Sequence, residues 1–244
     1  MAFDVDQAPV GRHDTPYPME GSILQTIKKP VTRDLLLLGA VVLLLTVPFL
    51  KQPFHLDDRD FVNFARIAAS HQKTVYKEDY TYLGFVHPLA DVPDSHGPLL
   101  TTTLSGMLRL GSGYNEALFH FVYLIFPLIG AVSMYSLARR FTRWPLTTAL
   151  LLIFTPGFLV ISHTLMGNLP GLALVLAGAA LYIHGVDRGS WKLLAASVAA
   201  LILTGLTAFQ ALSVVPALLL YGATHRPVRY SAFQPLIQMA VARL

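Results

Sequence analysis

The chain contains no cysteine among its 244 residues. This absence excludes disulfide bonds, thiolate metal sites and cysteine nucleophiles, so any chemistry has to come from carboxylates, imidazoles, hydroxyls or cations. Charge is also scarce, because 13% of the residues are charged whereas a soluble domain carries about 25%. With 54% hydrophobic residues and a mean hydropathy of +0.54, the composition is typical of a membrane protein.

The net charge of +4 and the isoelectric point near 9.4 do not indicate nucleic-acid binding. The basic residues cluster beside apolar runs, where they set the orientation of a membrane protein. We therefore expect the lipid bilayer, and no nucleic acid, as a partner of this chain.

Six apolar runs are candidate membrane spans, since about 20 residues cross the hydrocarbon core of a bilayer. They cover residues 35–50, 117–137, 146–161, 169–186, 193–206 and 208–221. The predicted fold is an all-α polytopic membrane protein with about six transmembrane helices and a long outer loop after the first span. Residues 1–33 lack apolar periodicity and the pattern of a cleaved signal peptide, so they are expected to form a cytoplasmic tail. Residues 34–222 are expected to form the transmembrane domain, and residues 223–244 a cytoplasmic segment or the start of a further span.

Basic residues occur in every second connection between these runs. They are Lys28, Lys29 and Arg33, then Arg139, Arg140 and Arg143, then Arg188 and Lys192, and finally Arg226 and Arg229. Because short cytoplasmic loops retain Lys and Arg, this pattern predicts a cytoplasmic amino terminus in an inner or plasma membrane. It places the acidic segment 51–116 on the outer side.

Segment 51–116 contains two stretches that favour helices lying at the membrane surface. From Asp57 onward, apolar residues recur with the i, i+3, i+4, i+7 spacing of an amphipathic helix. The apolar positions are Phe61, Phe64, Ala65 and Ala68, and Arg59, Asn63 and Arg66 fall on the opposite face. The stretch "HGPLLTTTLSGMLRLG" at 96–111 is apolar but too short to span comfortably, which favours a second interfacial helix.

The order and spacing of these segments resemble the C-class membrane glycosyltransferases that use polyprenyl-phosphate-linked sugars. The branch concerned contains protein O-mannosyltransferases and lipid A aminoarabinose transferases. The segments that carry the resemblance are "LDDRDFVNFARIAA", "SHGPLLTTTLSGMLRLG", "YSLARRF" and "FTPGFLVISHTLMGNLP". The resemblance implies transfer of a sugar from a polyprenyl-phosphate donor to a hydroxyl of a protein or glycolipid acceptor outside the membrane.

The resemblance also implies roles for the two adjacent acids that open the loop helix. It aligns Asp57 with the catalytic acid of the family and Asp58 with its partner, and in metal-binding members this pair helps to hold a divalent metal ion. The residues alone allow another interpretation, in which Asp57 is a helix N-cap and Asp60 follows at the third position. The two roles of Asp57 are compatible.

The predicted substrate-binding residues are Arg59, His96, His163 and Asn168. Asn168 stands where relatives carry an Asp, and an amide forms hydrogen bonds but supplies no anionic ligand. Ala208 stands where relatives carry a phosphate-binding Lys, so stabilisation of the leaving phosphate is expected from a cation such as Arg59. The alternative for Arg59 is a solvated charge or a lipid head-group contact. For the histidines, the alternative is an interfacial or hydrogen-bonded ring.

Two further classes of function remain open. A noncatalytic membrane subunit of the same fold would keep the architecture without the donor site, and Asn168 and Ala208 favour it. A small transporter would need charges inside the membrane, which the six runs essentially lack. The chain is shorter than the family usually is and ends in an apolar stretch, so we expect an amino-terminal part of a longer enzyme or a reduced paralogue that works with a membrane partner subunit.

Overall fold

The computed structural model of this protein describes residues 31–70, 79–82, 85–88, 97–111 and 114–225. Most of these residues are helical. The helices at the start of the chain are α2 (Val31–Thr46), the 3-10 helix η2 (Val47–Phe49), α3 (Leu56–Ser70) and α4 (Pro98–Leu110). They are followed by α5 (Glu116–Tyr123), α6 (Ile125–Phe141), α7 (Pro145–Ile153), α8 (Pro156–Ile161) and α9 (Asn168–Arg188). The last helices are α10 (Trp191–Gly205), the 3-10 helix η5 (Phe209–Val214) and α11 (Val215–Thr224).

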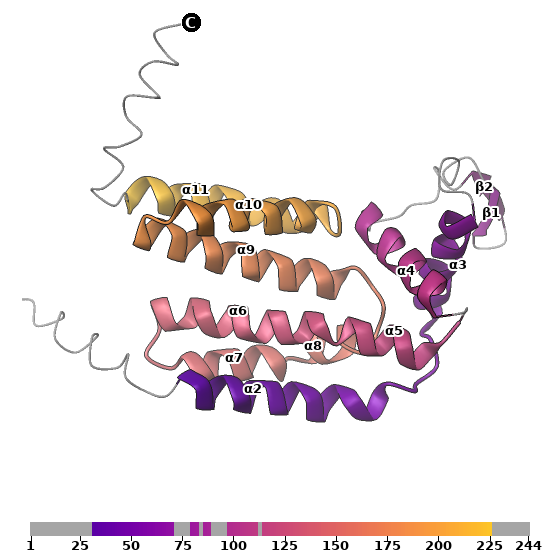
Figure 1. Cartoon of the computed structure of the whole chain (residues 1–244), viewed down its shortest axis with the longest axis horizontal. Helices are drawn as coiled ribbons and strands as arrows, with labels where there is room; N and C mark the ends of the chain where they lie inside the picture. The colour runs from indigo at the N-terminus through magenta and orange to yellow at the C-terminus, as the bar shows by residue number, and fades with distance from the viewer. Residues whose placement is uncertain (1–30, 71–78, 83–84, 89–96, 112–113, 226–244) are drawn as a thin grey trace, which may run out of the picture.

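The long helices lie side by side as a bundle (Figure 1), with α6 in contact with α2, α7 and α9, and α10 against the other side of α9. Its main core is apolar and consists of Leu38, Val42, Ala131, Tyr135, Ala149, Ile153, Phe158 and Leu169. Large apolar side chains also cover the outward faces, as Leu36 and Leu44 on α2 illustrate with 70% and 74% exposure. A helical bundle with apolar outer faces is consistent with a lipid environment, since all backbone bonds are satisfied within the helices.

Within the described part of the chain, three helical stretches are long and apolar enough to cross a membrane. They are Val31–Phe49, Glu116–Phe141 and Asn168–Arg188, and shorter apolar helices occupy Trp191–Gly205 and Phe209–Thr224. The prediction of a helical membrane protein is therefore supported, and the prediction of six spans stays a prediction. Residues 1–30 and 226–244 of the two expected cytoplasmic segments lie outside the described residues, whereas residues 31–33 already belong to α2.

The third predicted run, 146–161, is divided into α7 and α8 at Thr155. Proline at 156 disfavours a helical conformation in the residue before it, and Thr155 is extended with a ψ of 137°. The Thr155 hydroxyl accepts a hydrogen bond from the backbone N–H of Phe158 at 3.3 Å, which caps the first turn of α8.

Helices α9 and α10 approach closely through glycines that recur about every two helical turns on one face of α9. A Cβ at Gly178 would lie 2.9 Å from Leu201, and a Cβ at Gly185 would lie 2.8 Å from Leu194. The Ser197 hydroxyl donates a hydrogen bond to the carbonyl of Gly178 at 2.8 Å. Small residues thus let the two backbones come together, as is common between membrane helices.

The described chain is mostly helical, and one segment of the long loop forms a β-hairpin that the sequence analysis did not predict. Strands β1 (Asp79–Tyr82) and β2 (Phe85–Pro88) pair antiparallel, with Tyr80 opposite His87. The segment is rich in Tyr, Thr, Phe and Val, which favour strands because they pack well on a pleated surface.

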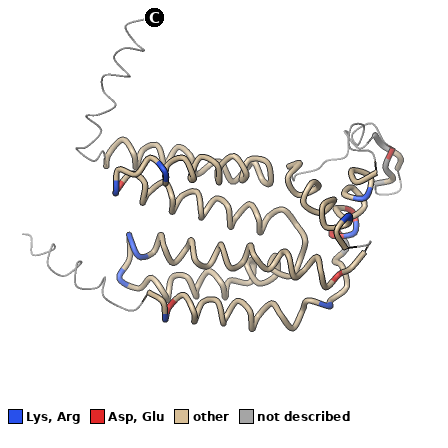
Figure 2. The backbone as a smooth tube through the Cα atoms, in the orientation of Figure 1, with Lys and Arg blue, Asp and Glu red and all other residues tan. Residues whose placement is uncertain are grey.

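Among the described residues, Lys, Arg, Asp and Glu positions gather at the two ends of the bundle (Figure 2), and the middle of the bundle has none. We call the end with α3, α4 and the hairpin the loop end. We call the opposite end the arginine end, and it is defined by Arg139, Arg140, Arg143, Arg188 and Lys192. The basic connections between α6 and α7 and between α9 and α10 therefore share one end.

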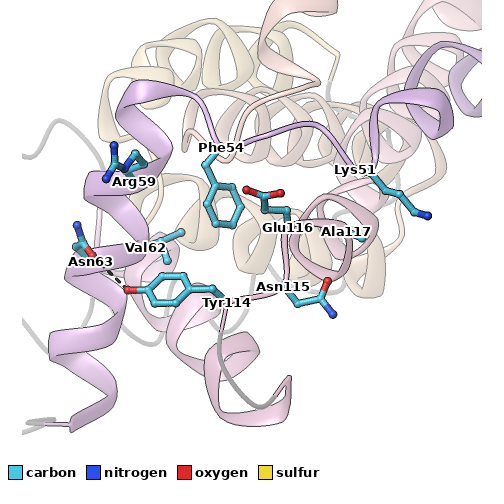
Figure 3. A pocket seen from close by; sticks show the side chains of 9 residues that line it. All are labelled: Lys51, Phe54, Arg59, Val62, Asn63, Tyr114, Asn115, Glu116 and Ala117. Atoms are coloured by element: carbon cyan, nitrogen blue, oxygen red, sulfur yellow. Dashed lines mark hydrogen bonds between the residues drawn. The ribbon is translucent and has the colours of Figure 1, made fainter.

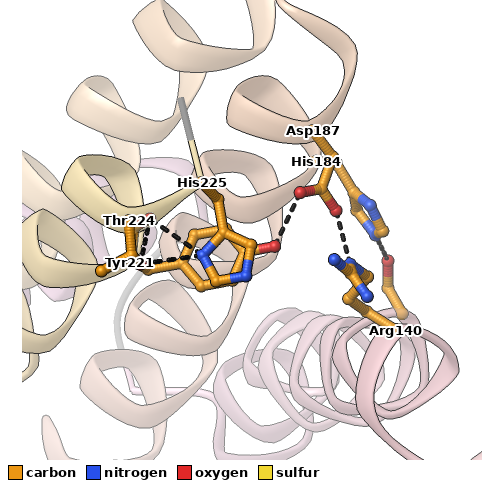
Figure 4. Close-up of polar contacts among 7 residues, drawn as sticks. Arg140, His184, Asp187, Tyr221, Thr224 and His225 are labelled. Carbon is orange, nitrogen blue, oxygen red and sulfur yellow. Dashed lines mark hydrogen bonds and ion pairs between the residues drawn. The ribbon is translucent and has the colours of Figure 1, made fainter. Parts of the chain in front are cut away.

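A polar network at the arginine end joins three helices (Figure 4). The Arg140 guanidinium on α6 pairs with one oxygen of Asp187 on α9 at 2.7 Å. The hydroxyl of Tyr221 on α11 donates a hydrogen bond to the other oxygen at 2.6 Å. The His225 ring stacks on Tyr221 with centroids 4.1 Å apart. Both carboxylate oxygens of Asp187 are thus bound by side chains from other helices.

Candidate functional site

The loop end is organised by the packing of α3 on α4. Val62 and Ala65 of α3 are fully buried in a cluster with Leu104 of α4. The Ser105 hydroxyl donates a hydrogen bond to the carbonyl of Ala65 at 2.7 Å. Both predicted loop helices are therefore present. The buried face of α3 includes Val62, which the predicted apolar stripe did not contain.

Asp58 is fully buried, with 0% of its surface exposed. One carboxylate oxygen accepts the backbone N–H of His55 at 3.0 Å. Because α3 begins at Leu56, this contact is the reach-back bond that a residue in the first turn makes to the residue before the helix. The other oxygen accepts the backbone N–H of Leu165 at 2.7 Å, 107 residues away. Asp58 thus fixes the start of α3 and attaches it to the connection between α8 and α9.

The environment of Asp58 acts on its pKa in both directions. Burial raises the pKa of this carboxyl, whereas the hydrogen bonds from Leu165 and His55 lower it, and the net direction is upward. The negative charge of Asp57 adds to the increase. Asp58 is consequently a structural acid that is held out of water.

Asp57 is exposed and is the second residue of α3. The interpretation of Asp57 as the N-cap is wrong. Helix α3 begins at Leu56, so Asp57 is already inside the helix, and it is Asp58 that accepts the N–H of His55 before the helix. A carboxylate in the first turn is still favourable, since it faces the positive end of the helix dipole. Of the two acids, Asp57 is the one whose carboxylate a ligand from water or from the lipid surface can reach.

His163 and Asn168 flank the segment that Asp58 holds. Nε2 of the His163 ring lies 2.9 Å from the carbonyl oxygen of Leu45, and the ring packs on Phe49 with centroids 4.5 Å apart. The Gln52 amide also donates a hydrogen bond to the carbonyl of His163. His163 therefore fastens the α8–α9 connection to the end of α2.

Asn168 is the first residue of α9 and is half-buried, three positions after the Leu165 that Asp58 binds. The structure thus brings the segment of His163 and Asn168 to the acid pair, while their predicted substrate-binding role stays a prediction. The predicted site residue His96 lies outside the described residues.

A cavity of about 710 Å³ lies at the loop end between α3, the segment after η2 and the start of α5 (Figure 3). Its lining residues are Lys51, Phe54, Arg59, Val62, Asn63, Tyr114, Asn115, Glu116 and Ala117. The predicted residue Arg59 belongs to this lining, whereas Asp57, Asp58, His163 and Asn168 do not. Consecutive helix residues are about 100° apart, so Asp57 projects roughly 160° away from Arg59. The cavity and the exposed acid are therefore on different faces of α3.

The predicted divalent metal ion is not matched by the donors at the acid pair. Both oxygens of Asp58 already accept backbone N–H groups, which leaves Asp57 as the accessible carboxylate. The described residues contain no group of three or more His, Cys, Asp or Glu side chains that could hold a metal. The metal stays a prediction of the resemblance.

Ala208, which the resemblance aligns with a phosphate-binding Lys, is buried in the structure. It is 3% exposed, and a Cβ placed on Gly171 would lie 2.6 Å from its methyl group. The start of α4 covers the same turn, because Gly97 donates a backbone hydrogen bond to Thr207 at 2.8 Å. A Cβ at Gly97 would lie 2.1 Å from the carbonyl oxygen of Leu206. The turn at residues 206–208 is therefore packed tightly against α9 and the start of α4, and its residues include no cation that could bind a phosphate.

His120 of α5 is a polar residue that the sequence did not single out. Its residue is 7% exposed, and its Nε2 is buried without a hydrogen-bond partner among the described residues. Its ring lies 6.0 Å from that of Phe54, which lines the cavity. The one available signal was a histidine within the apolar stretch "ALFHFVYLIF", one helical turn after Glu116.

No protein-family model, curated protein or solved structure matches this chain. Its function therefore has to be inferred from the geometry of the loop end.

Proposed function

We propose that this chain is a membrane-embedded glycosyltransferase, or part of one, that uses a polyprenyl-phosphate-linked sugar. The observation that supports the proposal is the exposed carboxylate of Asp57 at the start of α3. Its neighbour Asp58 is buried and held by two backbone hydrogen bonds. The pair lies at the end of an apolar bundle, where a lipid-held donor and an acceptor in water can meet. The acceptor is a hydroxyl of a protein or a glycolipid.

The proposed topology has six membrane spans, a cytoplasmic amino terminus in an inner or plasma membrane, and the loop end outside. The gathering of five basic residues at the arginine end supports it, because short cytoplasmic connections retain Lys and Arg. In this arrangement the short pair α7 and α8 crosses as one interrupted segment. The apolar stretch 208–221 forms the last crossing through η5 and α11.

In the proposed reaction, the acceptor hydroxyl attacks the anomeric carbon of the donor sugar while Asp57 accepts the hydroxyl proton. The bond between the anomeric carbon and the phosphate oxygen breaks, and polyprenyl phosphate leaves. Asp58 acts as a positioning residue, since it holds α3 against the α8–α9 connection. The Asn168 amide, close to this connection, is proposed to bind a sugar hydroxyl. Arg59 is on the other face of α3 and takes no part in this reaction.

The decisive experiment measures release of undecaprenyl phosphate from a panel of undecaprenyl-phosphate-linked hexoses and pentoses, by mass spectrometry on membranes that contain the chain in its natural assembly. Asp57→Asn is expected to lower release by about 10²- to 10⁴-fold, because a positioned base is lost. Asp79→Asn, an exposed acid on the hairpin, is the matched control and should retain release. Release at the wild-type rate by the Asp57→Asn protein would remove Asp57 from catalysis.

A noncatalytic membrane subunit is the second candidate, and the sealed position of Ala208 favours it. In that case the chain alone would release undecaprenyl phosphate from no member of the panel. A transferase that copurifies with the chain would then keep its activity when Asp57 is replaced by Asn. The same assay therefore separates the two candidates.

A further inference from the structure

Three charged residues line the cavity, Lys51, Arg59 and Glu116, and Arg59 and Glu116 carry opposite charges without forming an ion pair (Figure 3). The Arg59 guanidinium comes from α3 and the Glu116 carboxylate from the first residue of α5. Among the described residues neither side chain has a hydrogen-bond or ion-pair partner. The ring of Phe54 lies between them. Besides Lys51 at the rim, the cavity thus presents a cation and an anion that are separated by an aromatic face.

The aromatic walls of the cavity are fixed by their neighbours. Phe54 packs edge-on against Phe119 with centroids 5.7 Å apart. The Tyr114 hydroxyl donates a hydrogen bond to the side-chain carbonyl of Asn63 at 3.2 Å. An aromatic face beside a carboxylate is a good environment for an ammonium group, which is attracted by both. A guanidinium is a good partner for a phosphate.

The cavity lies at the level where two apolar helical stretches end. The stretch Val31–Phe49 ends just before Lys51, and the stretch Glu116–Phe141 begins with Glu116 itself. Lys51 points away from Glu116 at the rim (Figure 3). Lipid head groups occupy this level at the boundary of the hydrocarbon core.

We propose that this cavity binds the head group of a zwitterionic phospholipid, phosphatidylethanolamine, with its phosphate at Arg59 and its ammonium group between Phe54 and Glu116. The cavity volume of about 710 Å³ is within the range of small-molecule sites, roughly 300–1,000 Å³. Phosphatidylglycerol has the phosphate but no ammonium group, so its head group would offer no cation to Glu116, from which Lys51 points away (Figure 3). This site goes beyond sugar transfer and does not depend on the role of Asp57.

The test titrates the detergent-solubilised full chain with phosphatidylethanolamine or phosphatidylglycerol and counts bound lipids by native mass spectrometry. The wild-type chain is expected to prefer phosphatidylethanolamine. Glu116→Gln should weaken that lipid by about 10- to 100-fold, the size expected for a lost charge-assisted hydrogen bond, and leave phosphatidylglycerol unchanged. Arg59→Gln should weaken both lipids, since both carry a phosphate.

Asp79→Asn is the matched control for Glu116→Gln, and Arg66→Gln is the matched control for Arg59→Gln. Asp79 and Arg66 are exposed, and neither lines the cavity. Both controls should bind like the wild type. Equal binding of the two lipids to the wild-type chain, or an unchanged preference in Glu116→Gln, would overturn the proposal.

Free glycerophosphoethanolamine distinguishes a lipid from a soluble source of the same chemistry. It is expected to compete with the lipid only at large excess, because it lacks the acyl chains that hold the head group at the membrane. Binding of the free compound as tight as that of the lipid would identify the ligand as a soluble zwitterion and would overturn the assignment to a phospholipid.

Discussion

The acids at the two ends of the bundle have different kinds of partner. At the arginine end, Asp187 binds Arg140 and Tyr221, so charge links helices to one another. At the loop end, Asp58 is bound by backbone N–H groups alone, and its neighbour Asp57 is exposed. Glu116 across the cavity also lacks an ion pair within the described residues. The acid at the arginine end is thus bound by side chains of other helices, whereas Asp57 and Glu116 at the loop end are exposed and open to a ligand.

The largest effect is expected from Asp58→Ala, which would test whether the loop end depends on its buried acid. The change leaves the N–H groups of His55 and Leu165 without their acceptor, and each buried unsatisfied group costs about 1–3 kcal/mol. We expect the free energy of unfolding to fall by about 2–5 kcal/mol, measured by equilibrium unfolding in detergent. Asp57→Ala is the control and should cost less than about 1 kcal/mol, since its side chain is exposed. Equal stability of the two variants would contradict the structural role of Asp58.

A smaller effect is expected from Gly97→Ala, which would separate α4 from the turn before η5. The added Cβ meets backbone atoms of Leu206, which cannot move aside as a side-chain end can, so we expect a loss of about 1–3 kcal/mol. Gly106→Ala within α4 is the control, because a Cβ there meets no atom within 4 Å. It should stabilise α4 by about 0.5–1 kcal/mol, as Ala is the better helix former. The same unfolding experiment reads both variants, and a loss in Gly106→Ala equal to that in Gly97→Ala would contradict the docked contact.

At the arginine end, Asp187→Asn should have a modest effect even though Asp187 has two side-chain partners. The side chains of Arg140 and Asp187 are 41% and 24% exposed, and pairs open to solvent are worth about 0–1 kcal/mol. The Asn oxygen can still accept the Tyr221 hydrogen bond. Unfolding at low and high salt should show a loss below about 1 kcal/mol that shrinks with salt. A loss as large as that of Asp58→Ala would remove the contrast between the two ends.

The smallest effect concerns the pH dependence of Asp58. Because burial raises its pKa in the folded protein above the ordinary value of 3.8, the folded state holds the proton more tightly than the unfolded state. Its contribution to stability is therefore fully present below pH 3.8 and is lost as the pH rises through the raised pKa. Asp58→Asn removes this titration, so the stability of the wild type relative to Asp58→Asn should fall over that pH interval. A rise over the same interval, seen in unfolding curves, would show that the hydrogen bonds outweigh burial.

The sequence predicts helices well where the signal is local. The run 169–186 becomes α9, Asn168–Arg188, because a long apolar stretch needs no distant partner to be helical. The helix of the loop was also predicted from its apolar spacing. The division of 146–161 at Pro156 does not follow from hydropathy, because both halves are apolar, and only the conformational effect of the proline signals it.

The site was less predictable, because its geometry comes from residues far apart in the chain. Asp57 and Asp58 are identical in type and adjacent, and only the distant backbone of Leu165 decides that Asp58 is the buried one. Sequence proximity groups Arg59 with the acids, whereas the turn of the helix directs it to a cavity that the acids do not line. Glu116, which completes that cavity, lies at the start of another helix and carries no local signal that relates it to Arg59.

Because Gly171 and Ala208 are in close contact, the side chain tolerated at one position depends on the residue at the other. Each residue is small because its neighbour leaves no space, so a longer side chain at 208 requires the α9 backbone to retreat. Substitutions at residues in contact do not add independently. A cationic side chain at 208 would therefore need a compensating shift of α9, so this turn has no room for one while the present packing is kept.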